Sequence, residues 1–542
     1  MLLYHLGDKN KKNEIQLELK KGNEMINIRL EKKEIENILF IERFNNKKEI
    51  ELKSYFSKLS KKYNRNEILR ISLFNNKKEF MKTVAEQSKE SAESKIKMSK
   101  YNFKKHQFLM LDNRLVVGTK GVSSPEDWRQ LAFNLVKYIR KELPMCSIVY
   151  LDRKVTIKSK QFFEGLYLAD YKFNKYKSKK TPLTDLDFLV TQDFESEIDI
   201  MSQRNELLEV INEAKCKANS QQMVRDLVNT TPEDINPESM IDISMKKFGL
   251  STNIKVEIYD EEKLQKLNMK GHLTVNRGSK YKANLIKFTY EPKDFDRENN
   301  KVILGVGKGL TYDTGGLSLK PSGAMTTMKA DKSGAMTLYG LANLLSKQGS
   351  KNKVILYLPL AENAVSSESY RPDDVIVHKN GVTSHIENTD AEGRIVLMDS
   401  LILAQEENPD FDEIFSIATL TGSAIVQFGN EAAGMVSQNE ELFEKFLEKG
   451  VIEDEIFCEA KLHKFMMDGI KDNIADISNI GTPNQGCQKA ALYLMAGIKK
   501  KNLKKYIHLD IAGPAFVDKA FGTNVEGATG FGLRTLFEVY TK

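Results

Sequence analysis

Apolar residues in the second half of the chain gather in short runs, and segments with helical spacing separate most of these runs. The runs that read as strands lie at 285–288, 302–306, 354–358, 414–418 and 506–511. The segments with apolar residues at helical spacing lie at 334–345, 393–405 and 489–498. Strands that alternate with helices are typical of a largely parallel sheet covered by helices on both faces. We therefore predict an α/β fold for this half.

The N-terminal part mixes short apolar segments with lysine-rich loops. Strands are predicted at 68–73, 108–111 and 147–151, and a helix at 125–141. A polar helical segment follows at about 200–228 and ends at Asn229-Thr-Thr-Pro232, because a residue before proline is pushed out of helical geometry. The expected organisation is an N-terminal α/β domain over 1–195, a linking helix over 196–218 and a larger C-terminal domain over 219–542.

The composition is typical of a soluble globular protein, with 41% hydrophobic and 29% charged residues. A chain of 542 residues is long for one hydrophobic core, which favours two domains. No run approaches the roughly 18 apolar residues that a membrane span needs. The lysine-rich N-terminus lacks the order of a secretory signal. The four cysteines are scattered without metal-ligand spacing, so we expect reduced thiols and a cytoplasmic location.

The formal net charge of +7 arises from 82 Lys and Arg against 75 Asp and Glu. Because the two signs are intermixed along the chain, they indicate a solvated surface. No basic stretch is interleaved with aromatic residues as in nucleic-acid readers, so we do not expect a nucleic-acid partner.

A glycine-rich segment, GVGKGLTYDTGG at 305–316, follows one of the predicted strands. It lacks the four-residue gap before Gly-Lys and the following Ser or Thr of a Walker loop. Leu310 occupies the place of the third glycine of a dinucleotide-binding fingerprint. What remains is a strand that ends at Lys308, with Asp313 five residues later. By itself, the segment is explained at least as well by a turn with a surface lysine and a capping aspartate.

More acidic residues lie ahead of the predicted helices of the same sheet. Asp331 ends LSLKPSGAMTTMKAD, and Asp390 and Glu392 lie in NTDAEGR. Asp390 alone reads as a helix N-cap, and Glu392 as a first-turn acid. However, ligands gather beyond the strand ends of parallel sheets, and carboxylates that converge there repel one another unless cations balance them. Such oxygen ligands suit Mg²⁺, Mn²⁺ or Zn²⁺, and the absence of HExxH argues against a zincin-type protease.

Two stretches, GKGLTYDTGGLSLKPSGAMTTMKAD and NTDAEGRIVLMDSL, resemble the two signatures of the cytosolic leucyl aminopeptidases. The similarity runs from about residue 219 to the C-terminus and includes NTTPEDINPES, ATLTGSAIVQFG and HLDIAGPAF. The resemblance implies a cytoplasmic metallo-aminopeptidase that releases leucine-like N-terminal residues from peptides with broad specificity. It also implies a homohexamer, which nothing in the residues themselves indicates.

The resemblance further implies two divalent metal ions (Zn²⁺, Mn²⁺ or Mg²⁺) per subunit. Their ligands would be Lys308, Asp313, Asp331, Asp390 and Glu392. Asp331 and Lys308 would belong to the tighter ion, Asp390 to the more exchangeable one, and Asp313 and Glu392 would bridge the two. A lysine ligates a metal only when neutral, and lowering its pKa from about 10.4 to below 7 costs on the order of 4–5 kcal/mol. A nearby divalent cation in a dry site provides that shift.

The remaining implied roles concern catalysis and substrate. Lys320 would stabilise the oxyanion, and Arg394 would hold a bicarbonate ion that acts as general base. The pocket for the first substrate residue would be formed by Met328, Thr419, Leu420 and Gly422. Core packing explains the apolar members, Met328 and Leu420, equally well.

The chain departs from the family pattern in two places. Lys332-Ser333 follows Asp331 where Met and small residues are usual, and we expect Lys332 to face outward from the starting helix. Cys487-Gln488-Lys489 replaces smaller, less charged residues near the pocket, which leaves the preferred N-terminal residue open.

Two other functions stay open at this point. A two-metal phosphohydrolase would use similar carboxylates, although the chain has no phosphate-cradling loop. A DNA-binding protein on the same fold would use the basic excess, although the full set of catalytic residues argues against it.

Overall fold

In the computed structural model, the described residues are 197–541 apart from 467, together with parts of the N-terminal region. Those parts are 2–4, 14–21, 24–31, 40–44, 68–74, 107–111, 114–142, 148–151, 160–169, 171–179 and 186–190, with isolated residues between 77 and 105. The chain divides into two compact units, Met1–Lys215 and Cys216–Lys542.

The first unit contains a mixed six-stranded sheet. Its strands lie in the order β4 (Phe40–Phe44), β9 (Leu186–Val190), β8 (Ile148–Leu151), β5 (Ile68–Phe74), β7 (Arg114–Gly118) and β6 (Phe108–Leu111). Only the two outer pairs are antiparallel. Helix α5 (Pro125–Glu142) packs against α6 (Lys160–Leu168), and the buried pair Arg129–Glu164 joins them. The strands predicted at 68–73 and 108–111 and the helix at 125–141 are confirmed. Residue 147 lies outside the described residues.

The first unit also holds a separate three-stranded antiparallel sheet. Its strands are β1 (Leu2–Tyr4), β2 (Glu14–Lys21) and β3 (Glu24–Glu31). Strands and helices together make this unit α/β, as the sequence predicted.

The second unit is built on a nine-stranded, mostly parallel sheet. Eight strands lie in the order β10 (Ile254–Tyr259), β11 (Asn284–Tyr290), β14 (Lys353–Asn363), β12 (Val302–Gly307), β17 (Glu413–Ala418), β21 (Tyr506–Asp510), β18 (Ala432–Ser437) and β19 (Ile456–Glu459). The ninth, β13 (Gly309–Asp313), continues from β12 and pairs in parallel with the end of β14. The five central strands, β14, β12, β17, β21 and β13, are mutually parallel. The carboxyl ends of these strands therefore meet at one edge.

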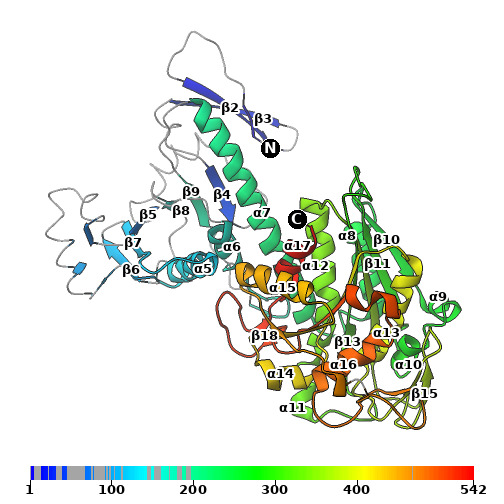
Figure 1. Ribbon diagram of the computed structural model, residues 1–542. Helices are drawn as coiled ribbons and strands as arrows, with labels where there is room; N and C mark the ends of the chain where they lie inside the picture. The colour runs from blue at the N-terminus through cyan, green and yellow to red at the C-terminus, as the bar shows by residue number, and fades with distance from the viewer. Residues whose placement is uncertain are drawn as a thin grey trace. The chain divides into compact units, whose positions relative to one another are not determined.

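Helices cover both faces of this sheet (Figure 1). One face is covered by α12 (Ser333–Gln348), α15 (Glu440–Glu453) and α17 (Leu533–Thr541), and the other by α10 (Lys270–Asn276), α13 (Gly393–Glu407) and α16 (Gly486–Met495). The sequence of strand β14 is a continuous apolar run because both faces of the strand are buried. Leu356 and Leu358 face the α12 side, while Ile355 and Tyr357 face the α13 side.

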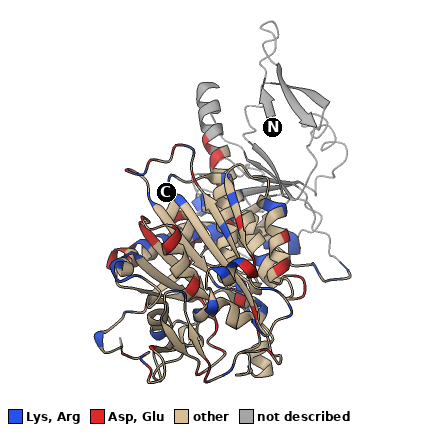
Figure 2. Ribbon diagram, turned by 90° about the vertical axis from the view of Figure 1, so that its right-hand side faces the viewer, with Lys and Arg blue, Asp and Glu red and all other residues tan. Residues whose placement is uncertain are grey.

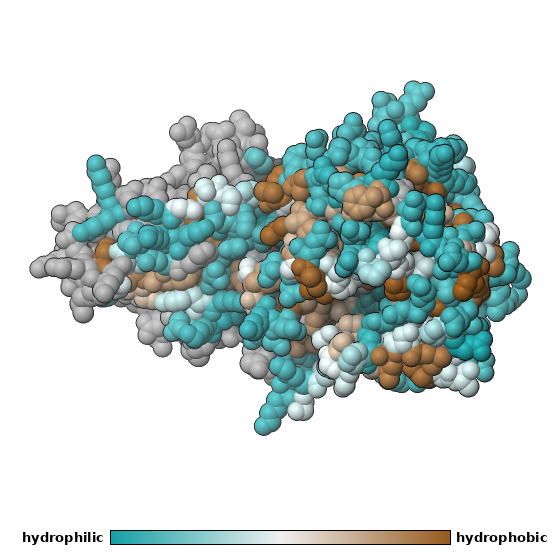
Figure 3. Space-filling view, turned by 60° about the horizontal axis from the view of Figure 1, so that its bottom comes forward, coloured by the Kyte–Doolittle hydropathy of each residue, from teal (hydrophilic) through white to brown (hydrophobic). Residues whose placement is uncertain are grey.

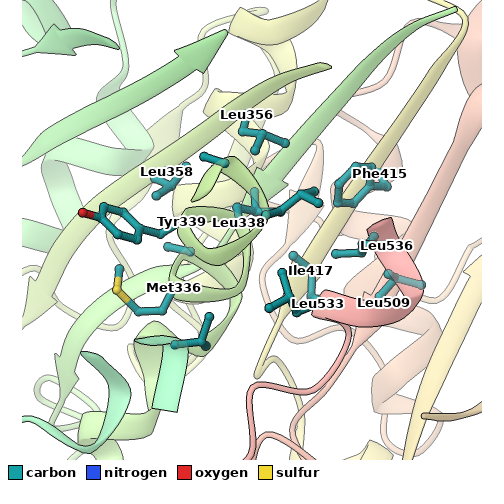
Figure 4. Close-up of a cluster of buried hydrophobic side chains, with 14 of the residues drawn as sticks. Met336, Leu338, Tyr339, Leu356, Leu358, Phe415, Ile417, Leu509, Leu533 and Leu536 are labelled. Atoms are coloured by element: carbon teal, nitrogen blue, oxygen red, sulfur yellow. The ribbon is translucent and has the colours of Figure 1, made fainter. Parts of the chain in front are cut away.

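The core on the α12 side is shown in Figure 4. Met336, Leu338 and Tyr339 of α12 lie against Leu356 and Leu358 of β14, and α17 contributes Leu533 and Leu536. Every one of these side chains is at most 1% exposed. Burial of one leucine-sized side chain contributes about 1.5–3 kcal/mol. Many such side chains together fix the helices against the sheet, and the helix N-termini are thereby held at the strand ends.

The structure moves several predicted element boundaries. Helix α7 covers Glu197–Asn229, slightly longer than the predicted 200–228. Helix α16 begins at Gly486 and ends at Met495, whereas the apolar spacing predicted 489–498. Ile498 still packs into the core after the helix has ended. Because it is apolar, the helical spacing of apolar residues in the sequence continued beyond the end of the helix. Strand β14 continues to Asn363, five residues beyond the end of the strand predicted at 354–358.

The surface carries the intermixed charges that the composition indicated. In Figure 2, basic and acidic residues are interspersed over the described part of the chain. In Figure 3, apolar residues on the face toward the viewer form small patches among hydrophilic ones. Among the described residues, no helix combines the length and the apolar character that a membrane span requires.

Candidate active site

The main chain of Lys308 is pinned at the carboxyl end of β12. Its N–H donates to Ile417 O of β17 at 3.0 Å, and its carbonyl accepts from Ala335 N of α12 at 2.7 Å. Gly334 permits this approach, since a Cβ there would lie 2.9 Å from Lys308 N and would overlap Ile417 O. The first turn of α12 therefore fixes Lys308 where the central strands end.

The side chain of Lys308 joins two acidic segments. Its Nζ lies 2.8 Å from Asp331 Oδ1 and 2.8 Å from Glu392 Oε1, and it donates to Thr419 O at 3.0 Å. Lys308 is 3% exposed. Burial disfavours its charge, but the carboxylates of Asp331, Glu392 and Asp313 outweigh burial and raise its pKa. Lys308 is thus a buried cation that holds Asp331 and Glu392 together.

Lys320 connects a second pair of carboxylates. Its Nζ lies 2.8 Å from Asp313 Oδ2 and also pairs with Asp390. Carboxylate oxygens of Asp313, Asp390 and Glu392 all lie within 4.8 Å of one another. Burial, and then the charge of Asp313, raise the pKa of Glu392 to about 8. Burial likewise raises the pKa values of Asp331 and Asp390.

Divalent cations fit the donors that meet here. The group contains four carboxylates against the two ammonium groups of Lys308 and Lys320, so it carries an excess of negative charge. Asp331 Oδ2 is buried and accepts no hydrogen bond from any described residue. Buried charge of one sign is costly unless cations balance it, and carboxylate oxygens are the ligands that hard divalent cations prefer. The five predicted ligands and Lys320 are therefore brought together in one cluster.

Positioning residues that the sequence prediction did not name hold the two acidic loops together. Asn363 Nδ2 donates to Asp313 Oδ1 at 2.8 Å and to Thr389 O at 3.0 Å. Asn363 lies directly opposite Asp313 in the β13–β14 register. Tyr370 Oη also donates to Thr389 O, at 2.7 Å. The rule that ligands gather beyond strand ends draws attention to the residues after 358, but it does not single out Asn363 among the polar residues there.

Arg394 lies in the first turn of α13, two residues after Glu392. Its Nη1 donates to Asn479 O at 2.7 Å. Its Nε is buried and has no hydrogen-bond partner among the described residues. Burial lowers the pKa of Arg394. The guanidinium is thus anchored on one side to the segment around Asn479 and keeps a donor for an anion.

The four predicted substrate-binding residues lie on two segments, one that begins with Thr419 and one that carries Asp331. Thr419 Oγ1 donates to Asp331 Oδ1 at 2.8 Å, which places Thr419 against a predicted ligand. Leu420 is half-buried, and its N–H donates to Asp510 Oδ1 at 3.1 Å. Gly422 begins α14 (Gly422–Phe428) and is exposed, and a Cβ on it would meet nothing within 4 Å. Met328 is half-buried at the start of η3 (Met328–Lys332), the short turn that carries Asp331.

The expectation that Lys332 faces outward is wrong. Its side chain is buried, and Nζ donates to Thr230 O at 3.1 Å. Lys329 donates to Asn229 O at 2.9 Å in the same way. Helix α7 ends at Asn229, and the last carbonyls of a helix attract cations because they lack intrahelical partners. The end of α7 therefore draws both lysines toward itself.

Comparisons with known proteins identify the chain's relatives. The model of the cytosol aminopeptidase family, catalytic domain, matches residues 222–537. The probable cytosol aminopeptidase of Aquifex aeolicus is 34% identical over 430 residues, which cover 79% of this chain and 83% of the relative. That of Persephonella marina is 37% identical over 376 residues, covering 69% of this chain and 72% of the relative.

Solved structures agree. The bottromycin maturation enzyme BotP in complex with Mn has a TM-score of 0.73 and 26% identity, and the match covers 88% of this chain and 99% of BotP. A variant of tomato leucine aminopeptidase has a TM-score of 0.75 at 24% identity, covering 88% and 93% of the two chains, and shows the same fold. With the family model spanning more than half of its length, the chain belongs to the cytosol aminopeptidase family and is a metallo-aminopeptidase, a hydrolase that uses divalent metal ions.

Proposed function

We propose that the chain uses two divalent metal ions to release leucine-like N-terminal residues from peptides. The observation that carries this proposal is the convergence of the buried Asp313 and Glu392 with the half-buried Asp390, whose oxygens lie within 4.8 Å of one another. Asp331 is linked to this group by Lys308, whose Nζ contacts both Asp331 and Glu392. Once Lys308 has lost its proton to become a ligand, the four carboxylates and the ammonium of Lys320 carry three net negative charges. One divalent cation balances only two of these charges, which favours a second ion.

Bound divalent cations would supply Lewis-acid activation of water and of the scissile carbonyl. Asp313, Asp331, Asp390 and Glu392 would hold the ions, since Lys308 contacts Asp331 and Glu392 while Lys320 contacts Asp313 and Asp390. Lys308 takes part as a ligand only after losing its proton. The carboxylates that raise its pKa would then also bind the ions. The positive charge of the ions would lower the pKa of the amine instead.

Two cationic side chains would act on the substrate's reacting group. Lys320 contacts Asp313 and Asp390, so its ammonium would lie beside a carbonyl oxygen that approaches cations held by these carboxylates. Its ammonium would donate a hydrogen bond to the developing oxyanion, a contribution typically worth roughly 10²–10³ in rate. Arg394 would hold bicarbonate as a general base, and its buried, unpartnered Nε supports binding of an anion.

Substrate selection would begin with the free amine, because an unblocked amine is itself a metal ligand and an internal peptide bond offers none. The open space beside Gly422 would take the first side chain. An apolar pocket distinguishes side chains by only about 1–3 kcal/mol per methylene, so we propose broad specificity. We extend the homohexamer implied by the family resemblance, and the cytosolic location in the relatives' names, to this chain as part of the same proposal.

The test compares leucine-p-nitroanilide with N-acetyl-leucine-p-nitroanilide, before and after chelation and with Mn²⁺ or Zn²⁺ restored. We expect hydrolysis of the free-amine substrate alone, loss on chelation, recovery with metal and saturation at two ions per chain. Equal hydrolysis of the acetylated substrate, or full activity with one ion, would contradict the proposal.

Two further assays address the alternatives from the sequence. Cleavage of p-nitrophenyl phosphate in place of the anilide would indicate a two-metal phosphohydrolase. Tight duplex binding with a steep salt dependence, together with no hydrolysis, would indicate a DNA-binding protein.

A further inference from the structure

A lysine outside the metal cluster holds a loop that borders it. Lys489 lies in the first turn of α16 and is 2% exposed. Its Nζ donates to three consecutive main-chain carbonyls, those of Thr482, Pro483 at 2.8 Å and Asn484 at 2.7 Å. An ammonium group has three donors, so this loop takes all of them.

The backbone of the loop has an uncommon conformation. Asn484 and Gln485 have φ values of 70° and 53°, so two successive non-glycine residues are left-handed. Gly481 has a φ of 77° and turns the chain at the other end of the loop. Such a backbone persists only where surrounding contacts compensate for it. The three hydrogen bonds from Lys489 are contacts of this kind.

The loop runs between two parts of the active site. At one end, Asn479 O accepts a hydrogen bond from Arg394 Nη1 at 2.7 Å. At the other end, a Cβ on Gly486 would lie 2.9 Å from Ser423 Cβ, so the loop touches the first turn of α14. Ser423 follows Gly422, beside which the space is open. Segment 479–486 therefore extends from Arg394 to the space assigned to the first substrate side chain.

We propose that Lys489 is a positioning residue for substrate selection, which fixes segment 479–486 as one wall of the pocket for the first residue. This inference rests on the proposed function. The sequence raised the concern that Lys489 brings charge to the pocket. In the structure its ammonium is turned into the loop, which leaves the wall to main-chain and uncharged groups.

The consequence is a selectivity that depends on a residue remote from the reacting atoms. Without the ammonium, three carbonyls lose their donor and the left-handed turn loses its support. A leucine side chain reaches such a wall and depends on its position, whereas an alanine side chain is too short to do so. Loosening the wall should therefore reduce the preference for leucine over alanine without removing metal.

The test uses Lys489→Met, which keeps the length of the side chain and removes its donors. The matched control is Lys499→Met, the same change at an exposed position in the turn after α16. We compare kcat/KM for leucine- and alanine-p-nitroanilide, metal content, and hydrogen–deuterium exchange of segment 481–486. In Lys489→Met the leucine-to-alanine ratio should fall by at least about threefold, exchange in the segment should accelerate and metal content should not change. Lys499→Met should match the wild type.

Lys489→Arg provides the second variant. It keeps the positive charge, but its planar fork cannot direct donors at three converging carbonyls, so its ratio should lie between those of wild type and Lys489→Met. If Lys489→Met does not fold, Lys489→Arg alone decides, and a wild-type ratio in it overturns the inference. An unchanged ratio and unchanged exchange in a folded Lys489→Met also overturn it. A wild-type protein inactive on both substrates would instead refute the proposed function, while exchange in segment 481–486 would still report the Lys489 contact.

Discussion

Gly393 leaves the space that the side chain of Lys308 occupies. A Cβ on Gly393 would lie 2.6 Å from Lys308 Nζ, well inside van der Waals contact. Lys308 cannot easily move aside, because it is buried and tied to Asp331, Glu392 and the carbonyl of Thr419. The glycine of NTDAEGR is therefore required by a side chain that lies 85 residues earlier in the chain.

We expect Gly393→Ala to displace Lys308 and to lower kcat/KM by about 10²-fold, the usual consequence of moving a catalytic group by roughly 1 Å. The matched control is Gly323→Ala in α11 (Ser322–Met325), where a Cβ meets nothing within 4 Å. Steady-state kinetics and circular dichroism on both variants check the prediction. Wild-type kinetics in Gly393→Ala would show that Lys308 does not need its observed position.

Lys320→Ala should lower kcat by roughly 10²–10³ while the protein keeps its metal, because the ammonium stabilises negative charge that develops during the reaction. Metal analysis by mass spectrometry and kinetics on the same sample separate the two effects. Normal turnover would contradict the role assigned to Lys320, and loss of metal would assign it to holding the site together.

Glu392→Ala should lose bound metal, since it removes the carboxylate that lies within reach of both Asp313 and Lys308. Glu444→Ala is a matched control, an exposed glutamate of α15. Calorimetric titration of chelated protein with Mn²⁺ gives stoichiometry and affinity for both variants. Two tightly bound ions in Glu392→Ala would show that the ligand assignment is wrong.

The contacts of Glu407 predict a pH-dependent contribution to stability. Burial opposes its charge, but hydrogen bonds from Lys287 at 2.8 Å, Tyr259 at 2.7 Å and Tyr357 at 2.8 Å outweigh burial and lower its pKa. A carboxyl with a lowered folded-state pKa stabilises the fold above its unfolded pKa of about 4.3, and this stabilisation is lost as the pH falls through the folded value.

Glu407→Gln should therefore reduce the free energy of unfolding by about 1–3 kcal/mol at pH 7.5, the usual worth of hydrogen bonds to a charged group. The difference from wild type should shrink as the pH falls below about 4. Urea unfolding of both proteins at several pH values measures it. A difference that stays constant with pH would mean that the charge of Glu407 contributes nothing.

The sequence by itself determined the fold class and pointed to the carboxylates that the structure brings together. Apolar runs such as the one that became β14 are long enough to identify a strand buried on both faces, because strand periodicity is local. Asp331, Asp390 and Glu392 stand out because each lies near an expected strand end or helix start, and parallel strands bring their carboxyl ends to one edge. The ligand roles, including that of Lys308, come from the resemblance to the cytosolic leucyl aminopeptidases.

Only the tertiary structure decided which groups partner these residues. Asn363 could be matched to Asp313 only once the register of β13 against β14 was known. Lysine side chains usually lie at the surface, yet those of Lys332 and Lys489 are both buried. Lys332 donates to a carbonyl that is distant in the sequence, and Lys489 donates to the carbonyls of a turn. The type of a side chain and the periodicity around it can both be read from the neighbouring positions in the sequence. The carbonyl that a lysine meets depends on long-range packing, so no local pattern reveals it.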